Sequence, residues 1–323
     1  MPLKLPWQSL RKQPPPLVEV ASRASTSMSD IKLPVEAAAR GAELLESSHV
    51  ETAELGDLAK LPPFRPVVIT LLKLFDQPEV TLQEVCSLVE ADPAMASELL
   101  AIVNSPLFPI RQTVSRPSHA ITLLGTERTK SLAATLAMRS LMTGGPRIPI
   151  VRRFWMHSVA TATLARHLAP AFRLEPELAQ VSGLLHELGR HGLLAAYPLK
   201  YAQLACAAYE NASAILAAEQ AELGMSHCQA GILLANAWHL PATLREAAGH
   251  HLDAGSDVPL VSLVQLCCCL ADEFMYQAIH RCDLRKPEAT VELRVPLALR
   301  RTITDQLESV RAAIDTAIRA LDF

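Results

Sequence analysis

The stretch GLLHELGR at residues 183–190 places a histidine and a glutamate side by side in an apolar, helix-forming segment. The apolar spacing around it predicts a helix over residues 176–188. On that helix, His186 shares a face with three small residues, Ala179, Ser182 and Gly183. Small side chains let a second helix approach closely, so we expect this stretch to carry polar groups into a packed helical interior.

The composition of the whole chain favours the same fold class. Of 323 residues, 50% are hydrophobic and only 4% are aromatic, with few glycines and many alanines and leucines. Alanine and leucine lose little on entering a helix, so we expect an all-α fold. A formal net charge of −3 excludes a globally basic nucleic-acid binder and a polybasic membrane protein.

The cysteines and the apolar runs indicate the cellular compartment of the protein. Cys267, Cys268 and Cys269 are adjacent, and the seven cysteines contain no CxxC pair, so they form no disulfide or zinc framework. No run of about 18 apolar residues suggests a membrane span, and residues 1–11 lack the apolar core of a signal peptide. We expect a cytoplasmic protein with reduced cysteines and no membrane contact.

Prolines and glycines divide the chain into four parts. We expect a mostly disordered tail and linker over residues 1–60, with residues 1–32 disordered and a short helix at 35–45. Leu61-Pro62-Pro63 opens an N-terminal helical lobe over 61–145, and Gly144-Gly145-Pro146 separates it from a second helical lobe over 146–282. An extension over 283–323 completes the chain, with a short strand at 290–295 and an amphipathic helix at 297–321.

Helix boundaries follow from capping residues and prolines. Asp92-Pro93 is a favourable N-cap and first residue, and Ser226 with Gln229 forms a capping-box pattern. We expect helices over residues 93–103, 118–124, 128–141, 153–169, 176–188, 226–238, 241–251 and 259–280. On the last helix, apolar residues alternate four and three apart and form a coiled-coil-like seam, which predicts packing on the helical body or a homodimer: Ile303, Leu307, Val310, Ile314, Ala317 and Leu321.

Histidines and acids on the second lobe form the candidate site. His157 shares a stripe with Ala160 and Leu164 and points into the core, and Asp272 lies in an apolar setting. Imidazoles and carboxylates that converge from several helices are how helical bundles build metal sites. The candidate ligands are His157, His186, Glu187 and Asp272, with His227, His250 and His251 nearby.

Each of these residues also has an ordinary structural interpretation. His157 could be a core histidine that donates to a carbonyl, and His186 could fill a gap between helices. Asp272 could pair with an arginine such as Arg190.

The order His, His-Glu, Asp is similar to the order His, His-Asp, Asp of the HD metal-dependent phosphohydrolases. More closely, the chain resembles the HDOD family, the HD-related output domain of bacterial signalling proteins. The matching pieces run in order from about residue 61 to 275: Leu61-Pro62, Asp92-Pro93, Val103-Asn104-Ser105, Leu124-Gly125, residues 154–158, residues 183–190, Glu219, Gly224, His227, Gly231, residues 238–241 and His250-His251.

This resemblance implies a two-lobed helical HDOD-type domain whose second lobe is a degenerate HD hydrolase. It departs from the enzymes at Glu187, which stands for aspartate, and at Arg190, which stands for a lysine. After His250-His251 the chain reads Leu252-Asp253, without the Gly-Tyr-Pro element of relatives that cleave cyclic di-GMP.

We therefore expect a non-catalytic regulatory module that acts through protein contacts and needs no cofactor. Its partner would be a kinase, a receiver or a cyclic-dinucleotide enzyme. The alternative is a metal-dependent phosphohydrolase with manganese, iron or nickel, in which Arg190 would stabilise developing charge as the candidate catalytic residue.

A second alternative rests on local charge. Between residues 111 and 153 eight basic residues accompany a single acid, Glu127. Such a stretch could bind nucleotides, nucleic acid or an acidic protein face, or it could be a set of solvated faces. The candidate anion-binding residues are Arg111, Arg116, Arg128, Lys130, Arg152 and Arg153. Residues 81–100 could be read as a helix-turn-helix, but Glu98 and the lack of arginine on its second helix argue against nucleic acid as the partner.

Overall fold

The computed structural model describes residues 57–77, 79–105, 108, 112–141, 148–253 and 256–321. The all-α fold is confirmed: in these residues the sole sheet joins β1 (Ala208–Tyr209) to β2 (His280–Arg281) in parallel. The expected tail, the expected helix at 35–45 and the expected break at 144–146 lie outside the described residues. No described helix is long and apolar enough to cross a bilayer.

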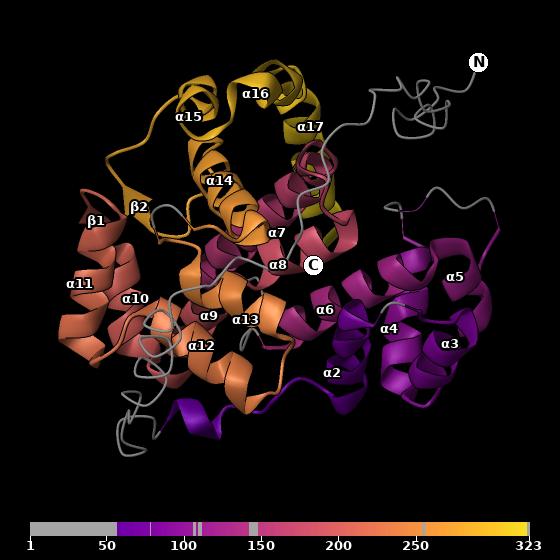
Figure 1. Cartoon of the computed structure of the whole chain (residues 1–323). Coiled ribbons are helices and arrows are strands. Elements are labelled where there is room, and N and C mark those ends of the chain that lie inside the picture. The colour runs from indigo at the N-terminus through magenta and orange to yellow at the C-terminus, as the bar shows by residue number, and fades with distance from the viewer. Residues whose placement is uncertain are drawn as a thin grey trace, which may run out of the picture. The chain divides into compact units, whose positions relative to one another are not determined.

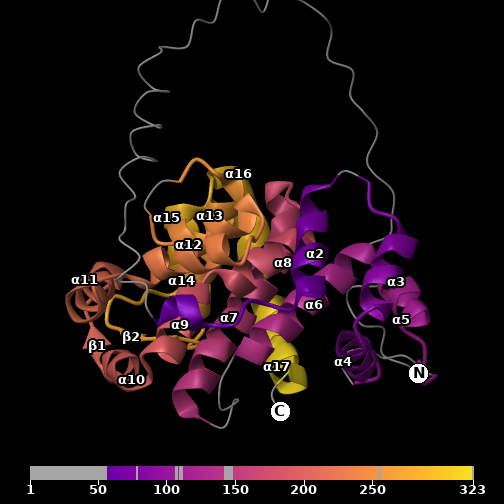
Figure 2. The same ribbon diagram turned by 90° about the horizontal axis from the view of Figure 1, so that it is seen from below.

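The first group of helices precedes residue 142. It comprises η1 (Leu58–Lys60), α2 (Pro66–Lys73), η2 (Leu74–Asp76), α3 (Leu82–Glu90), α4 (Pro93–Val103), α5 (Pro117–Leu124) and α6 (Thr126–Leu141). The expected cap at Asp92 is present, because its side chain accepts from the amide of Met95. Helices α2 to α5 lie on one side of α6 in two views of the chain (Figure 1, Figure 2).

The second group surrounds α7. It comprises α7 (Pro149–Leu168), η3 (Ala169–Phe172), α8 (Pro176–Leu185), α9 (Leu188–Ala196), α10 (Pro198–Cys206), α11 (Ala212–Leu223), α12 (His227–Ala237), α13 (Ala242–His250) and α14 (Pro259–Glu273). Helices α8, α14 and α17 pack on α7. The capping box of Ser226 and Gln229 is present. Sequence analysis did not predict α9, α10 and α11.

Two predicted helices end earlier than expected. The helix begun at Pro176 ends at Leu185, so His186 and Glu187 lie at the junction between α8 and α9. There the ring of His186 bonds back to the carbonyl of Gly183 (Nδ1 to O, 2.7 Å). The helix expected over 259–280 ends at Glu273, and Met275 adopts a left-handed φ of 73° as the chain turns away.

The C-terminal extension corrects two further predictions. Residues expected to form a strand at 290–295 belong to the helix α15 (Pro287–Arg294). The buried residues Val291 and Val295 are separated by four positions, which is the spacing of one face of a helix and not the two-residue alternation of a strand. The expected helix over 297–321 is two helices, α16 (Leu297–Thr304) and α17 (Leu307–Leu321), because the amide of Gln306 bonds three residues back to Ile303 and tightens the turn.

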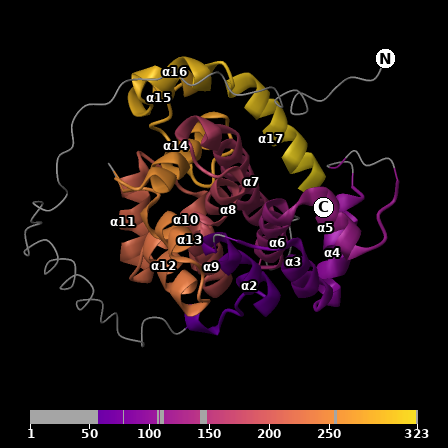
Figure 3. The same ribbon diagram turned by 45° about the vertical axis from the view of Figure 1, so that its right-hand side comes forward.

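The seam on the last helix is buried within this chain. Ile303, Leu307, Val310, Ile314 and Leu321 are each less than one tenth exposed. Helix α17 packs on α7, beside which it runs in Figure 3. Of the two expected outcomes for the seam, the structure shows packing on the helical body.

Candidate functional site

Three histidines surround one oxygen of Glu187. His157 comes from α7, His186 and Glu187 from the junction of α8 and α9, and His251 from the end of α13. Their Nε2 atoms lie 3.9, 3.8 and 4.0 Å from Oε1 of Glu187. All four side chains are buried. The helices thus bring three of the four predicted ligands together and add His251, which sequence analysis had placed only nearby.

The far nitrogen of each ring is held by a carbonyl oxygen. His157 Nδ1 lies 2.8 Å from the Tyr276 carbonyl, and His251 Nδ1 lies 3.3 Å from that of Ala248, as His186 does with Gly183. Because Nδ1 donates in these bonds, Nε2 is left to accept in the neutral ring. Burial lowers the pKa of His186 well below its ordinary value and that of His251 to about 3, so both rings stay neutral near pH 7.

His157 differs from its two neighbours. Burial alone would lower the pKa of His157, but the charge and hydrogen bond of Asp272, together with the charge of Glu187 and the Tyr276 carbonyl, outweigh burial and raise the pKa above the ordinary value. The Nε2 atoms of His157 and His186 lie 3.2 Å apart. Two facing lone pairs repel, so a proton on His157 or a cation must lie between them.

Arg190 occupies the other side of Glu187. Its Nε contacts Oε2 of Glu187 directly, and its Nη1 lies 3.3 Å from Oε1 of Glu219. Burial would raise the pKa of Glu187, but Arg190 and the surrounding histidines hold it well below its usual range. The carboxylate is therefore ionised and already paired inside the protein.

Glu219 joins Arg190 to a second group of polar side chains. It accepts from Tyr201 Oη at 2.7 Å and from His227 Nδ1 at 2.6 Å. Arg190 Nη2 lies 3.2 Å from His227 Nε2. Glu219 and Tyr201 were not among the predicted site residues. Glu219 was among the pieces that carried the family resemblance, which was the one available signal.

Asp272 and His250 do not face the centre of the site, although both were among the predicted candidates. Asp272 Oδ1 lies 3.2 Å from Nδ1 of His157, the ring nitrogen that faces away from Glu187. It pairs with Arg281 at 3.6 Å and not with Arg190. His250 is 42% exposed and bonds to Asp253 at 2.7 Å, outside the cluster. Asp272 thus orients His157, as carboxylates behind metal-binding histidines do.

The donor set fits a divalent metal in type and spacing. His157, His186, Glu187 and Cys268 each offer a ligand atom, and these atoms lie within 4.8 Å of one another. Nε2 of His251 is buried and has no hydrogen-bond partner among the described residues. Neutral imidazoles with their far nitrogens fixed are the usual ligands of zinc, iron and nickel.

The space at the cluster is small. The cavity bordered by His157, Glu187, Arg190, Cys268 and Asp272 holds about 20 Å³. That is room for one water molecule. A phosphoester does not fit there without a movement of the surrounding helices.

The basic stretch is dispersed over several environments. Lys130 is buried and pairs with Glu127 at 2.7 Å, and Arg128 pairs with Glu177 at 3.4 Å. Arg116 is exposed at the start of α5, and Arg111 lies outside the described residues. Arg152 and Arg153 line a separate pocket near the start of α7. The five candidates for anion binding that the structure describes therefore do not form one patch.

Comparison with known proteins gives a family match. The sequence profile of the HDOD domain matches residues 61–254. An uncharacterized protein of Treponema pallidum (strain Nichols) is 23% identical over 207 residues, which is 62% of this chain. The chain spans only 40% of that relative's length.

Solved structures show the same fold. An HDOD domain protein of unknown function from Geobacter sulfurreducens is 20% identical, with a TM-score of 0.66 over 80% of this chain and 97% of its own. A Marinobacter aquaeolei VT8 protein named for signal transduction is 20% identical, with a TM-score of 0.65 over 83% of this chain and 61% of its own. A Shewanella amazonensis SB2B protein named as a phosphohydrolase is 18% identical, with a TM-score of 0.59 over 84% of this chain and 98% of its own.

Proposed function

Because the chain belongs to the HDOD family, we propose that it is a non-catalytic signalling module that acts through contacts with another protein. The observation that carries this proposal is the contact between Arg190 and Glu187 in a cavity of about 20 Å³. A hydrolytic metal centre needs an open coordination position and room for its substrate. Here the guanidinium of Arg190 already occupies one side of the Glu187 carboxylate.

The buried polar side chains of the site, called the polar cluster from here on, have a structural role. They are His157, His186, Glu187, Arg190, Glu219, His227, His251 and Asp272. The polar cluster connects α7, the junction of α8 and α9, α13 and α14 through paired and hydrogen-bonded groups. Buried charges that lose a partner cost several kcal/mol, so the cluster fixes how these helices pack. A partner protein would recognise the surface that this packing holds. A kinase, a receiver or a cyclic-dinucleotide enzyme is the partner class that the family resemblance suggests.

The test combines metal content with activity. The protein is purified without chelator, its bound metals are counted by mass spectrometry, and hydrolysis of bis(p-nitrophenyl) phosphate is measured with added Mn²⁺, Fe²⁺ or Ni²⁺. We expect no turnover above the buffer rate. The double variant His186→Ala/Glu187→Ala should lower the melting temperature, because it removes the centre of the buried cluster, while leaving that background rate unchanged.

The second candidate is a metal-dependent phosphohydrolase, favoured by the three Nε2 atoms around Oε1 of Glu187. His157, His186, His251 and Glu187 would hold the metal, which would supply a water of lowered pKa. Arg190 would stabilise negative charge on the substrate. Stoichiometric Mn, Fe or Ni, together with turnover that disappears in the double variant, would establish this candidate and exclude the first.

A further inference from the structure

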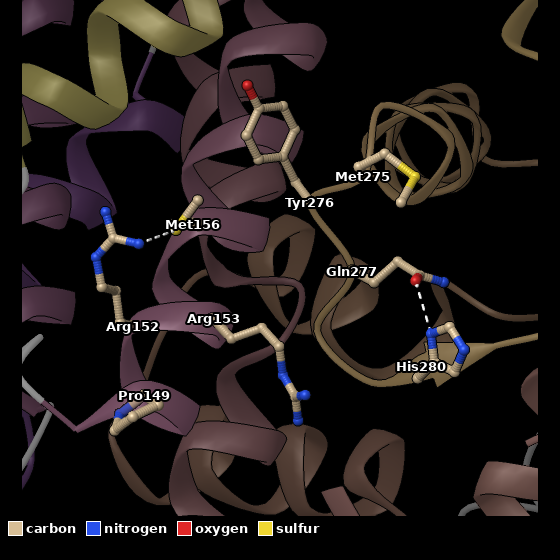
Figure 4. A pocket seen from close by; sticks show the side chains of 8 residues that line it. All are labelled: Pro149, Arg152, Arg153, Met156, Met275, Tyr276, Gln277 and His280. Carbon is tan, nitrogen blue, oxygen red and sulfur yellow. Dashed lines mark hydrogen bonds between the residues drawn. The ribbon is translucent and has the colours of Figure 1, made fainter. Parts of the chain in front are cut away.

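A pocket of about 430 Å³ lies between the first turns of α7 and the chain that follows α14. Figure 4 shows its lining side chains. The volume falls in the range of small-molecule sites. It is distinct from the 20 Å³ cavity of the polar cluster, although Tyr276 lies between the two.

One end of the pocket is cationic. Arg153 and His280 project into the lower half of the view in Figure 4, with the amide of Gln277 above His280. None of the lining residues is a carboxylate. Arg153 donates to the Ala205 carbonyl through Nη2, but its buried Nε has no hydrogen-bond acceptor among the described residues. The Arg153 guanidinium lines the pocket, and its positive charge would attract an anion there.

The other end of the pocket offers aromatic and thioether surface beside a second arginine. The ring of Tyr276 and the thioethers of Met156 and Met275 lie in the upper half of the same view, where the guanidinium of Arg152 donates to the sulfur of Met156 at 3.0 Å. Met275 is 73% exposed. The Tyr276 hydroxyl points away from the cationic end and bonds to Asp315 on α17. Aromatic and methionine side chains together provide a flat, adaptable contact for a ring.

We propose that this pocket binds a nucleotide, with the phosphate at Arg153 and His280 and the base against Tyr276 and the two methionines. The pocket has the size, the positive charge of Arg152 and Arg153, and the aromatic and thioether surface that such a ligand needs. This proposal does not depend on whether the polar cluster is catalytic, since it uses none of the cluster's side chains.

The pocket shares a backbone segment with the polar cluster. The carbonyl of Tyr276 accepts from His157, and Arg281 at the end of the same segment pairs with Asp272. Met275 begins the segment in a left-handed conformation that side chains rarely adopt. A nucleotide that moves residues 275–281 must therefore alter the two contacts that orient His157. The bound ligand would regulate the module through this segment.

The binding test uses isothermal titration calorimetry on the full chain with GMP, AMP and inorganic phosphate. We expect at least one mononucleotide to bind more tightly than phosphate. Gln277→Glu is nearly isosteric and puts a negative charge beside His280, and Arg153→Gln removes one of the two arginine charges of the pocket. Each should weaken nucleotide binding at least tenfold. Arg116→Gln is the matched control, because this exposed arginine lies outside the pocket and should leave the affinity unchanged.

Thermal melts establish that each variant is folded, and if Arg153→Gln fails to fold, Gln277→Glu decides. The proposal is overturned if no mononucleotide binds at about 1 mM, if phosphate binds as tightly as GMP and AMP, or if Arg116→Gln weakens binding as much as the pocket variants do. The link to the cluster is tested by imidazole nitrogen NMR. Saturating nucleotide should shift the Nδ1 resonance of His157, and an unmoved resonance refutes the link.

Discussion

Arg190→Met tests whether the buried guanidinium holds the polar cluster together. Methionine keeps most of the length of the side chain and removes its charge. Arg190 is 4% exposed and lies between Glu187 and Glu219, which are 3% and 1% exposed. The variant therefore leaves two buried carboxylates without their shared cation. Removing one partner of a buried ion pair costs about 3 to 5 kcal/mol, a large part of the 5 to 15 kcal/mol that stabilises a typical domain.

The assay is urea unfolding at pH 7, followed by circular dichroism, with the free energy of unfolding as the readout. Arg301→Met is the control, because Arg301 and its partner Asp305 are 95% and 70% exposed. It should unfold like the wild type. The double variant Arg190→Met/Glu219→Gln should be more stable than Arg190→Met alone, since it removes one of the unpaired charges. If Arg190→Met unfolds like Arg301→Met, the guanidinium does not hold the cluster together.

Three further outcomes are expected. Val310→Asp places a carboxylate in the buried contact of α17 and should cost at least about 3 kcal/mol without changing the sedimentation coefficient, whereas the exposed Ser309→Asp should unfold like the wild type. Burial would raise the pKa of Glu219, but His227 and Arg190 outweigh it and hold it at about 2 against an ordinary value of 4.5. The stability that Glu219 contributes is thus complete above about pH 4.5 and is lost as the pH falls toward 2. The free energy of unfolding of Glu219→Gln should therefore change less with pH between about 4.5 and 2 than that of the wild type. Gly189→Ala would put Cβ 1.8 Å from the His227 carbonyl and should prevent native packing, whereas Gly224→Ala meets open space and should cost only about 1 kcal/mol for its positive φ, as thermal melts would show.

The parts of the fold that sequence analysis predicted have strong local signals. Asp92-Pro93 and the capping box of Ser226 start α4 and α12 where expected, because capping is decided within one turn. Helix α11 is also capped, because the side chain of Asn211 accepts from the amide of Ala214, but its sequence ASAILAAEQAEL is rich in alanine, so its buried and exposed faces differ little in hydrophobicity. The alternation at residues 290–295 predicted a strand, whereas Pro287 begins a helix whose buried residues are set by packing.

The site was predictable in its members but not in its contacts. Helical stripes placed His157 and His186 in the interior, where both lie. The stripes could not show which nitrogen of His157 would face Asp272, because that depends on how α14 packs against α7. The partnership of Arg190 with Glu219 depends on where α11 packs, and α11 was not predicted.

Glu187 explains why the two halves of the cluster act as one unit. Its Oε1 faces the three imidazoles, while its Oε2 contacts Arg190, which lies three residues later on α9. An aspartate would be one methylene shorter, so it would withdraw both oxygens by about the 1.5 Å of a carbon–carbon bond. Side chains three residues apart on a helix are neighbours, so a glutamate here can meet Arg190 without leaving the histidines. The longer carboxylate therefore joins His157, and through it the Tyr276 carbonyl, to the Arg190–Glu219 pair in one chain of contacts.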